Sequence, residues 1–176
     1  MKKMLLTAVV ALMTLTASAQ VYVGGQVGFW RNHSQNETQF TIAPEVGYNL
    51  SDNWAIGIAL GYNYAYNELG VGDKWNGLKV NPYARYTFAK FGPVNLFADG
   101  GFEFETGKYK GGKAGNDWGV GIKPGVAVNL TDKLSFVSHV GFLGYRDSND
   151  YGAKGDDGLG CFLDATDVTF GLYYNF

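Results

Sequence analysis

The last ten residues of the chain, Asp167 to Phe176, alternate between apolar side chains and small or polar ones. The apolar series consists of Val168, Phe170, Leu172, Tyr174 and Phe176. Because successive side chains of a β-strand point to opposite faces, this period of two predicts a strand with one apolar face. The pattern continues to the last residue without a polar tail, so we expect this strand to face membrane lipid.

The first residues have the pattern of an export signal. Two lysines precede an apolar run from Met4 to Leu15, and the small residues Ala17-Ser18-Ala19 follow. The run is too short for a spanning helix and is typical of a secretory signal peptide. We predict that residues 1–19 are cleaved and that residues 20–176 form a single barrel domain in the cell outer membrane.

The composition excludes several classes of function. Charged residues make up 17% of the chain, against about 25% in typical soluble domains, while aromatic residues reach 16%. The formal net charge of −2 offers no basic stripe, so we expect no nucleic-acid partner. A single cysteine, Cys161, excludes an intramolecular disulfide and is expected in a surface loop.

Alternation through the rest of the mature chain predicts eight antiparallel strands. The clearest lies near Trp54 to Tyr64, where bulky residues alternate with Ala, Gly and Asn. The other strands are expected near residues 21–30, 38–50, 78–88, 94–104, 118–130, 134–145 and the end of the chain. We therefore predict an all-β, eight-stranded, up-and-down transmembrane barrel.

The connections alternate between short and long. Residues 50–53, 89–93 and 130–133 are tight turns, whereas residues 31–37, 65–76, 105–117 and 146–164 are expected to form four long loops. In outer-membrane barrels the short turns face the periplasm and the long loops face outside. We expect both termini of the barrel domain on the periplasmic side.

A soluble barrel that binds a ligand inside could show the same alternation. Such a barrel needs many Lys and Glu residues on its exterior. The non-apolar positions here are mostly Gly, Ala, Asn, Ser and Thr, which suit a narrow lumen. The membrane barrel is therefore the preferred interpretation.

Trp and Tyr side chains at the ends of the strands predict the aromatic girdles of such a barrel. Trp30, Trp75 and Trp118 fall near the predicted outer ends, and Trp54 falls near an inner end. Tyr174 completes the expected girdle set.

The signal peptide, the strand alternation, the turn and loop asymmetry and Phe176 together give the mature chain a resemblance to a known class. It resembles the small eight-stranded outer-membrane barrels of the outer-membrane protein X and outer-membrane protein A transmembrane-domain type. The resemblance implies that Phe176 is part of the signal read by the barrel assembly machinery. These families include structural anchors, adhesion surfaces and lipid-modifying enzymes, so the resemblance leaves the function open.

The strand phase places several charged residues inside the barrel. They are Glu45, Lys79, Arg85, Asp99, Glu103 and Lys123. The hairpin between the fourth and fifth strands brings Arg85 near Asp99, so we expect an Arg85/Asp99/Lys123 cluster, with His139 joining the same network. Because eight strands leave room only for side chains, we interpret this network as a structural plug rather than an ion path.

Catalytic and metal-binding patterns are weak. His139 adjoins Ser138 on a strand, where neighbouring residues face opposite sides and form no dyad. His33, beside Ser34, has no evident orienting acid. The Asp147-x-Asn149 pattern departs from a calcium loop at its later ligand positions. We therefore predict no enzyme activity, no catalytic residues, no metal and no cofactor.

The sequence favours a structural or surface-interaction role through the four loops, with a narrow pore for small solutes as the alternative and a lipid-modifying enzyme as a weaker one. The polar loop composition favours polar or glycan contacts with an extracellular ligand. The other expected partners are outer-membrane lipid and lipopolysaccharide. We expect a monomer.

Overall fold

The computed structural model describes residues 20–32, 37–67, 74–109, 114–149, 157–162 and 169–176. The predicted signal peptide, His33 and Ser34 lie outside these ranges. Among the described residues, no helix is long and apolar enough to cross a membrane.

The described residues form ten strand segments in one antiparallel sheet. The first six are β1 (Val21–Asn32), β2 (Glu37–Asn49), β3 (Trp54–Asn67), β4 (Lys74–Phe91), β5 (Val94–Tyr109) and β6 (Ala114–Asn129). The remaining four are β7 (Leu134–His139), β8 (Phe142–Asn149), β9 (Asp157–Phe162) and β10 (Thr169–Asn175).

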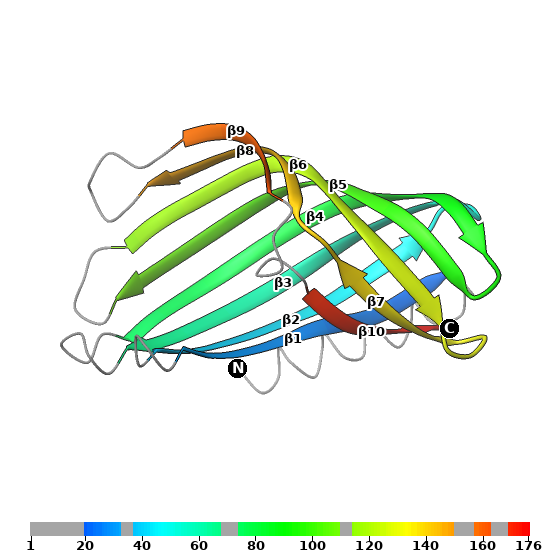
Figure 1. The fold of residues 1–176 in the computed structure, drawn as a ribbon, viewed down its shortest axis with the longest axis horizontal. Helices are drawn as coiled ribbons and strands as arrows, with labels where there is room; N and C mark the ends of the chain where they lie inside the picture. The colour runs from blue at the N-terminus through cyan, green and yellow to red at the C-terminus, as the bar shows by residue number, and fades with distance from the viewer. Residues whose placement is uncertain (1–19, 33–36, 68–73, 110–113, 150–156, 163–168) are drawn as a thin grey trace, which may run out of the picture.

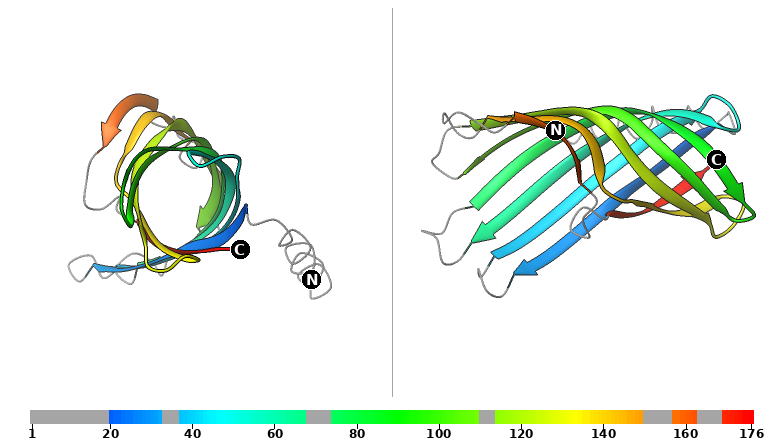
Figure 2. Two further views of the ribbon diagram at one scale, coloured as in Figure 1. Left: turned by 90° about the vertical axis from the view of Figure 1, so that its right-hand side faces the viewer. Right: turned by 45° about the horizontal axis from the view of Figure 1, so that its top comes forward.

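These segments close into the predicted eight-stranded barrel (Figure 1). Segments β7 and β8 both pair with β6 and together occupy the seventh position. Segments β9 and β10 occupy the eighth position, because β9 pairs with β8 while β10 pairs with β7 and β1. The β1–β10 ladder closes the ring of strands seen end-on in Figure 2.

The seventh strand is interrupted where β6 carries a proline. Pro124 has no N–H to donate to the ladder. Opposite it, Val140 and Gly141 leave the strand, the Val140 N–H donates to the Pro124 oxygen at 2.9 Å, and Gly141 has a φ of +73°. A local bulge of this kind explains why one predicted strand appears as two segments.

The strands extend further toward the long-loop end than the sequence pattern predicted. Segment β4 begins at Lys74, β5 continues to Tyr109, and β9 lies inside the segment expected to be the fourth loop. The expected loop position of Cys161 is therefore wrong: it is an exposed residue of β9, paired with Leu143. Backbone hydrogen bonds between strands need no apolar side chains. The alternation of apolar residues therefore underestimates the length of strands that continue beyond the lipid.

The outward face of the barrel is apolar. Ile56, Ile58 and Leu60 of β3 are 47%, 38% and 52% exposed, whereas Ala55 between Trp54 and Ile56 is buried. At the long-loop end the outward row of β4 changes from Leu78 to polar residues. This exterior is that of a barrel that faces lipid, as predicted.

The tight turns lie at the opposite end, which we call the turn end. The side chains of Ser51 and Thr131 hold two of them, because each hydroxyl oxygen accepts a hydrogen bond from the backbone N–H three residues later, at 3.1 and 2.9 Å. Gly92 adopts a φ of +59° in the turn between β4 and β5. Residues 49–52 and 129–132 share the sequence pattern Asn-Leu-Ser/Thr-Asp, and this similarity has a local hydrogen-bonding cause.

Candidate functional site in the barrel lumen

Arg85 lies at the centre of the turn-end half of the lumen. Its Nε and Nη2 groups donate to the two Asp99 oxygens, each at 2.7 Å, and Nη2 lies 3.8 Å from Glu45 Oε1. Arg85 and Asp99 are direct partners in the β4–β5 register. Because all three side chains are buried, the bidentate pair compensates charges that would otherwise be costly inside the barrel.

Aromatic rings surround the Arg85 guanidinium. Its carbon lies 4.1 Å from the ring centre of Phe97, and the next rings are those of Tyr83, Tyr173 and Tyr22 at 5.2, 5.3 and 5.9 Å. This geometry adds cation–π attraction to the ion pair. The rings and the charged residues fill the same cross-section of the barrel.

The tyrosine hydroxyls satisfy the Glu45 carboxylate. Tyr173 donates to Glu45 Oε2 at 2.5 Å, and Tyr83 donates to Oε1. The Tyr22 hydroxyl lies 2.5 Å from that of Tyr83. Among the described residues, no buried side-chain nitrogen or oxygen lacks a hydrogen-bond partner.

His139 completes this group from β7. Its Nε2 lies 2.7 Å from Asp99 Oδ2, and its Nδ1 lies 3.2 Å from Gln26 Nε2 of β1. A ring that donates from Nε2 and accepts at Nδ1 satisfies both contacts. We call this group the Arg85 plug, and it consists of Tyr22, Glu45, Tyr83, Arg85, Phe97, Asp99, His139 and Tyr173.

Glycines on neighbouring strands make room for the rings of the Arg85 plug. A Cβ atom on any of these glycines would overlap an aromatic side chain. The pairs are Gly24 with Tyr173, Gly47 with Tyr22, Gly57 with Tyr83 and Gly125 with Phe97. The small residues of the inward rows thus allow large rings to cross a narrow lumen.

A second polar group lies nearer the long-loop end, around Glu103 of β5. Lys79 Nζ lies 3.0 Å from Glu103 Oε2, Lys123 Nζ contacts Oε1, and Arg146 Nη2 lies 3.9 Å from Oε2. Asn81 Nδ2 donates to Oε1 at 2.9 Å. We call these five residues the Glu103 cluster.

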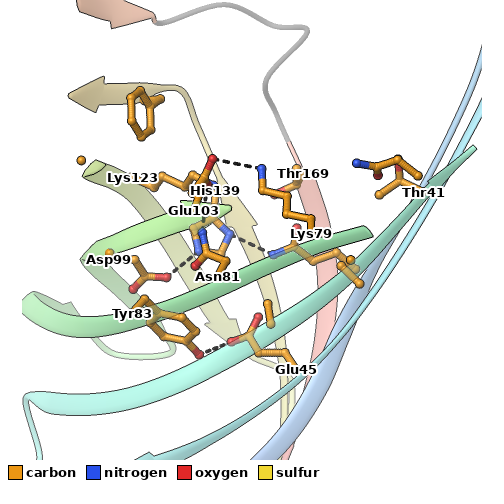
Figure 3. Close-up of a pocket in the computed structure, with 18 of the residues that line it drawn as sticks. Thr41, Glu45, Lys79, Asn81, Tyr83, Asp99, Glu103, Lys123, His139 and Thr169 are labelled. Carbon is orange, nitrogen blue, oxygen red and sulfur yellow. Dashed lines mark hydrogen bonds and ion pairs between the residues drawn. The ribbon is translucent and has the colours of Figure 1, made fainter. Parts of the chain in front are cut away.

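A cavity of about 240 Å³ lies beside both groups (Figure 3). Glu45, Tyr83, Asp99 and His139 of the Arg85 plug contribute to its wall, as do Lys79, Asn81, Glu103, Lys123 and Arg146. The lumen is therefore packed around Arg85 and hollow beside the Glu103 cluster. The expectation of a side-chain-filled lumen describes the first of these halves and not the second.

The predicted Arg85/Asp99/Lys123 cluster is only partly present. Arg85 bonds to Asp99, but Lys123 bonds to Glu103 instead. Asp99 and Lys123 are partners in the β5–β6 register, and the next inward pair toward the long-loop end is Gly101 with Gly121. Arg85 and His139 already occupy the Asp99 carboxylate, and the lysine chain reaches past this pair to Glu103.

The predicted aromatic girdle holds in part. Trp54, Trp118 and Tyr174 lie on the lipid face, with exposures of 49%, 39% and 40%. Trp75 does not: it shares the inward phase of β4 with Lys79 and covers Gly77 and Gly107. The side chain of Trp30 lies outside the described ones.

Sequence reasoning identified the charged residues of the lumen but missed the aromatic ones. Tyr22, Tyr83, Phe97 and Tyr173 occupy inward positions that the alternation had reserved for small residues. The signal that could have found them is the set of inward glycines beside each ring. Arg146 was missed because it was assigned to a loop, whereas it belongs to β8.

The adjacent Ser138 and His139 and the terminal Phe176 can be placed as well. His139 points to Asp99 and Gln26, and Ser138 precedes it on the strand, pairing across the ladder with Phe170. The backbone N–H of Phe176 donates to the Val21 oxygen at 3.1 Å, which holds the chain end against β1.

Comparisons with known proteins agree with this architecture. Residues 4–176 match the family model described as outer membrane protein beta-barrel domain. No curated protein matches the chain. Similar solved structures include Neisserial surface protein A, at 16% identity and a TM-score of 0.52, covering 90% of this chain and 98% of that one.

Two further structures are similar over most of their length. The N-terminal barrel domain of Pseudomonas aeruginosa OprF has 13% identity and a TM-score of 0.42, covering 90% of this chain and 98% of that one. E. coli outer membrane protein W has 11% identity and a TM-score of 0.47, covering 89% and 97%. The family match and the lipid-facing exterior place this chain among the outer membrane protein beta-barrel domain proteins of the outer membrane.

Proposed function

We propose that this outer-membrane barrel is closed to solutes and acts through its outward-facing end, as a structural or surface-interaction protein without enzymatic activity. The observation that carries the proposal is the Arg85 plug. Its rings and ion pairs fill the lumen where Arg85 is 8% exposed and Phe97 is 1% exposed. A solute could pass only if this packed and fully hydrogen-bonded group opened.

The height of the barrel wall supports the second half of the proposal. The outward row of β5 changes from Phe104 to Thr106 and Lys108, yet the β5–β6 ladder continues to the Lys108–Ala114 pair. About four residues of strand therefore extend past the apolar band, or about 13 Å measured along the strand. A stiff paired wall that extends beyond the lipid is suited to presenting the connecting loops to an extracellular ligand.

Conductance tests the closed lumen. Folded protein in planar bilayers should give no steady conductance, and an altered-mobility gel should show that the same sample is folded. A triple variant with Tyr83, Arg85 and Phe97 replaced by alanine serves as the opened control if it folds. Steady conductance of the natural protein would favour the alternative, a narrow pore that includes the cavity beside Glu103.

Binding by intact cells tests the surface role. Cells that display the barrel should bind a glycan array more strongly than cells that display a version in which residues 68–73 are replaced by a two-residue turn. The shortened barrel must reach the surface in equal amount, as measured by an exposed epitope. Equal binding by both cell types over the whole array would contradict a glycan-binding role for that loop.

A further inference from the structure

Charged side chains on β2 to β6 are sorted by sign between the two faces of the barrel wall. The described carboxylates of these strands all have the inward phase, and they are Glu45, Asp99, Glu103, Glu105 and Asp117. On the outward face at the long-loop end, the described charged side chains of these strands are Lys74 of β4 and Lys108 of β5, both exposed. Within the described part of the chain, neither lysine has a carboxylate at ion-pair distance. This side of the barrel exterior therefore carries positive charge with no acid beside it.

The two lysines are close neighbours on the sheet. Lys108 is the direct partner of Asn76 in the β4–β5 register, and Lys74 lies two residues from Asn76 on the same face. Such diagonal positions are about 7–8 Å apart, within reach of long side chains. Two ammonium groups at this separation repel each other, so an anion that contacts both would lower the electrostatic energy of the pair. The spacing suits an anion with several oxygens.

Tyrosines of β3 lie beside the lysines. Tyr66 is the register partner of Lys74, whose ammonium nitrogen lies 5.6 Å from the centre of the Tyr66 ring. Tyr62, on the same outward face, donates from its hydroxyl to Asn76 Oδ1 at 2.7 Å. Tyrosines are enriched where a membrane protein crosses from lipid chains to headgroups, because the ring is apolar and the hydroxyl is polar. The ring positions therefore place this part of the wall at the membrane interface.

The height of the lysines above the apolar band agrees with this placement. Leu78 is the last apolar residue of the outward row of β4, and it pairs with Thr106. Lys108 lies two residues beyond that pair and Lys74 lies four residues beyond it, or about 7 and 13 Å along the strands. With the usual tilt of barrel strands, these distances correspond to heights of about 5 and 10 Å. A headgroup layer is about 5–8 Å thick, so flexible lysine side chains at these heights reach the headgroups.

The outward face of β8 and β9 has the opposite charge. Asp147 and Asp157 are register partners on this face, and Asp157 Oδ2 accepts a hydrogen bond from the Tyr145 hydroxyl at 3.0 Å. Two neighbouring carboxylates repel an anionic headgroup. An anionic lipid is therefore expected to contact β3, β4 and β5 in preference to β8 and β9.

We propose that this part of the wall binds the phosphate group of an anionic lipid in the membrane leaflet at the long-loop end. We call the site the lysine patch, and it consists of Tyr62, Tyr66, Lys74, Asn76 and Lys108. The two ammonium groups bind the phosphate oxygens through charge-assisted hydrogen bonds. The tyrosine rings and Leu78 contact the less polar part of the same lipid. The lysine patch lies outside the lumen, so this inference is independent of whether the barrel conducts.

Lipid A with both phosphates is the probe, titrated into the protein in phosphatidylcholine nanodiscs. Amide NMR shifts of Asn76 and Lys108 should saturate, whereas lipid A from which the phosphates have been removed should give no saturation. Lys74→Gln and Lys108→Gln should each weaken binding about fivefold, the effect of one lysine near an anionic lipid surface. Lys108→Arg keeps the charge and should retain the affinity. Both lysines are exposed, so these variants should fold.

Lys90→Gln is the matched control, because Lys90 lies at the turn end, where its ammonium group donates to the Asp52 backbone oxygen at 2.5 Å. It should leave the lipid titration at Asn76 and Lys108 unchanged. Equal binding of the two forms of lipid A, or unchanged affinity in both Lys74→Gln and Lys108→Gln, would overturn the proposal. Saturation of the same amides by inorganic phosphate in nanodiscs without lipid A would assign the patch to a free anion and overturn the lipid site. None of these outcomes affects the closed-lumen proposal, which conductance tests.

Discussion

The Arg85 plug and the Glu103 cluster are built from similar residues, yet they differ in charge balance and packing. The Arg85 plug places one cation among two carboxylates and four aromatic rings, all buried. The Glu103 cluster places one buried carboxylate among three partly exposed cations beside a cavity. The comparison shows that charged residues can close a narrow lumen at one height along the barrel and line a polar cavity at the next.

The largest effect is expected from removal of the central cation. Arg85→Met would leave Asp99 and Glu45 buried without their guanidinium, which should lower the free energy of unfolding by about 3–5 kcal/mol. The matched change at the other level, Lys123→Met, should cost less, because Lys79 and Arg146 still face Glu103. Urea titration in lipid bilayers, followed by tryptophan fluorescence, measures both. Equal losses would contradict the contrast between the two groups.

The tyrosine hydroxyls should have the next largest effect. Tyr173→Phe removes a donor from the buried Glu45 carboxylate and should cost about 2 kcal/mol, as expected for a hydrogen bond to a charged group. Tyr22→Phe is the control, because the Tyr22 hydroxyl contacts that of Tyr83 rather than Glu45. We expect about half the loss for Tyr22→Phe in the same urea titration. A larger loss for Tyr22→Phe would show that the Tyr22 hydroxyl stabilises the buried network more than the direct hydrogen bond from Tyr173 to Glu45 does.

Packing around Phe97 gives a third contrast. A Cβ at Gly125 would overlap the Phe97 ring and also approach the Ser138 backbone oxygen, so Gly125→Ala should cost about 1–2 kcal/mol. Gly61 lines the cavity, and its added Cβ would meet Lys79 Cβ at 3.1 Å, which a small shift can relieve. Gly61→Ala should therefore be nearly neutral in urea titration. Gly100→Ala, whose Cβ meets nothing closer than 4.0 Å, is the reference for the residue change itself.

The alternation of the sequence was sufficient to predict the barrel, because lipid on one side and a narrow lumen on the other impose a period of two on every spanning strand. It also placed Arg85 near Asp99, since the tight turn at Gly92 brings the two strands together. The direct pairing depends on a register shift between Thr87 and Ala89, which the alternation did not predict. It could not predict which carboxylate a long lysine side chain would reach. Lys123 leans past the Gly101–Gly121 pair to reach Glu103, a choice made by side-chain packing in three dimensions.

The inward aromatic residues show a second limit of sequence reasoning. A tyrosine is common both at a membrane interface and in a buried hydrogen-bond network, so composition does not distinguish the two. Tyr174 faces lipid, whereas Tyr173, one residue earlier, donates to Glu45. Trp75 was assigned to the girdle for the same reason, although its strand phase places it inside. Phase, counted from an established inward residue, is the more reliable guide.

The smallest effect is expected at the Glu103 cluster itself. Lys79 is 28% exposed and shares Glu103 with Lys123 and Arg146. Because the remaining cations still compensate the carboxylate and the lost contact is partly solvated, Lys79→Met should change the free energy of unfolding by less than about 1 kcal/mol. The same urea titration in lipid bilayers measures this change. A loss of unfolding free energy near that of Arg85→Met would show that Lys79 is as important for stability as the central residue of the Arg85 plug. The Glu103 cluster would then be a second structural ion-pair group that helps to close the lumen.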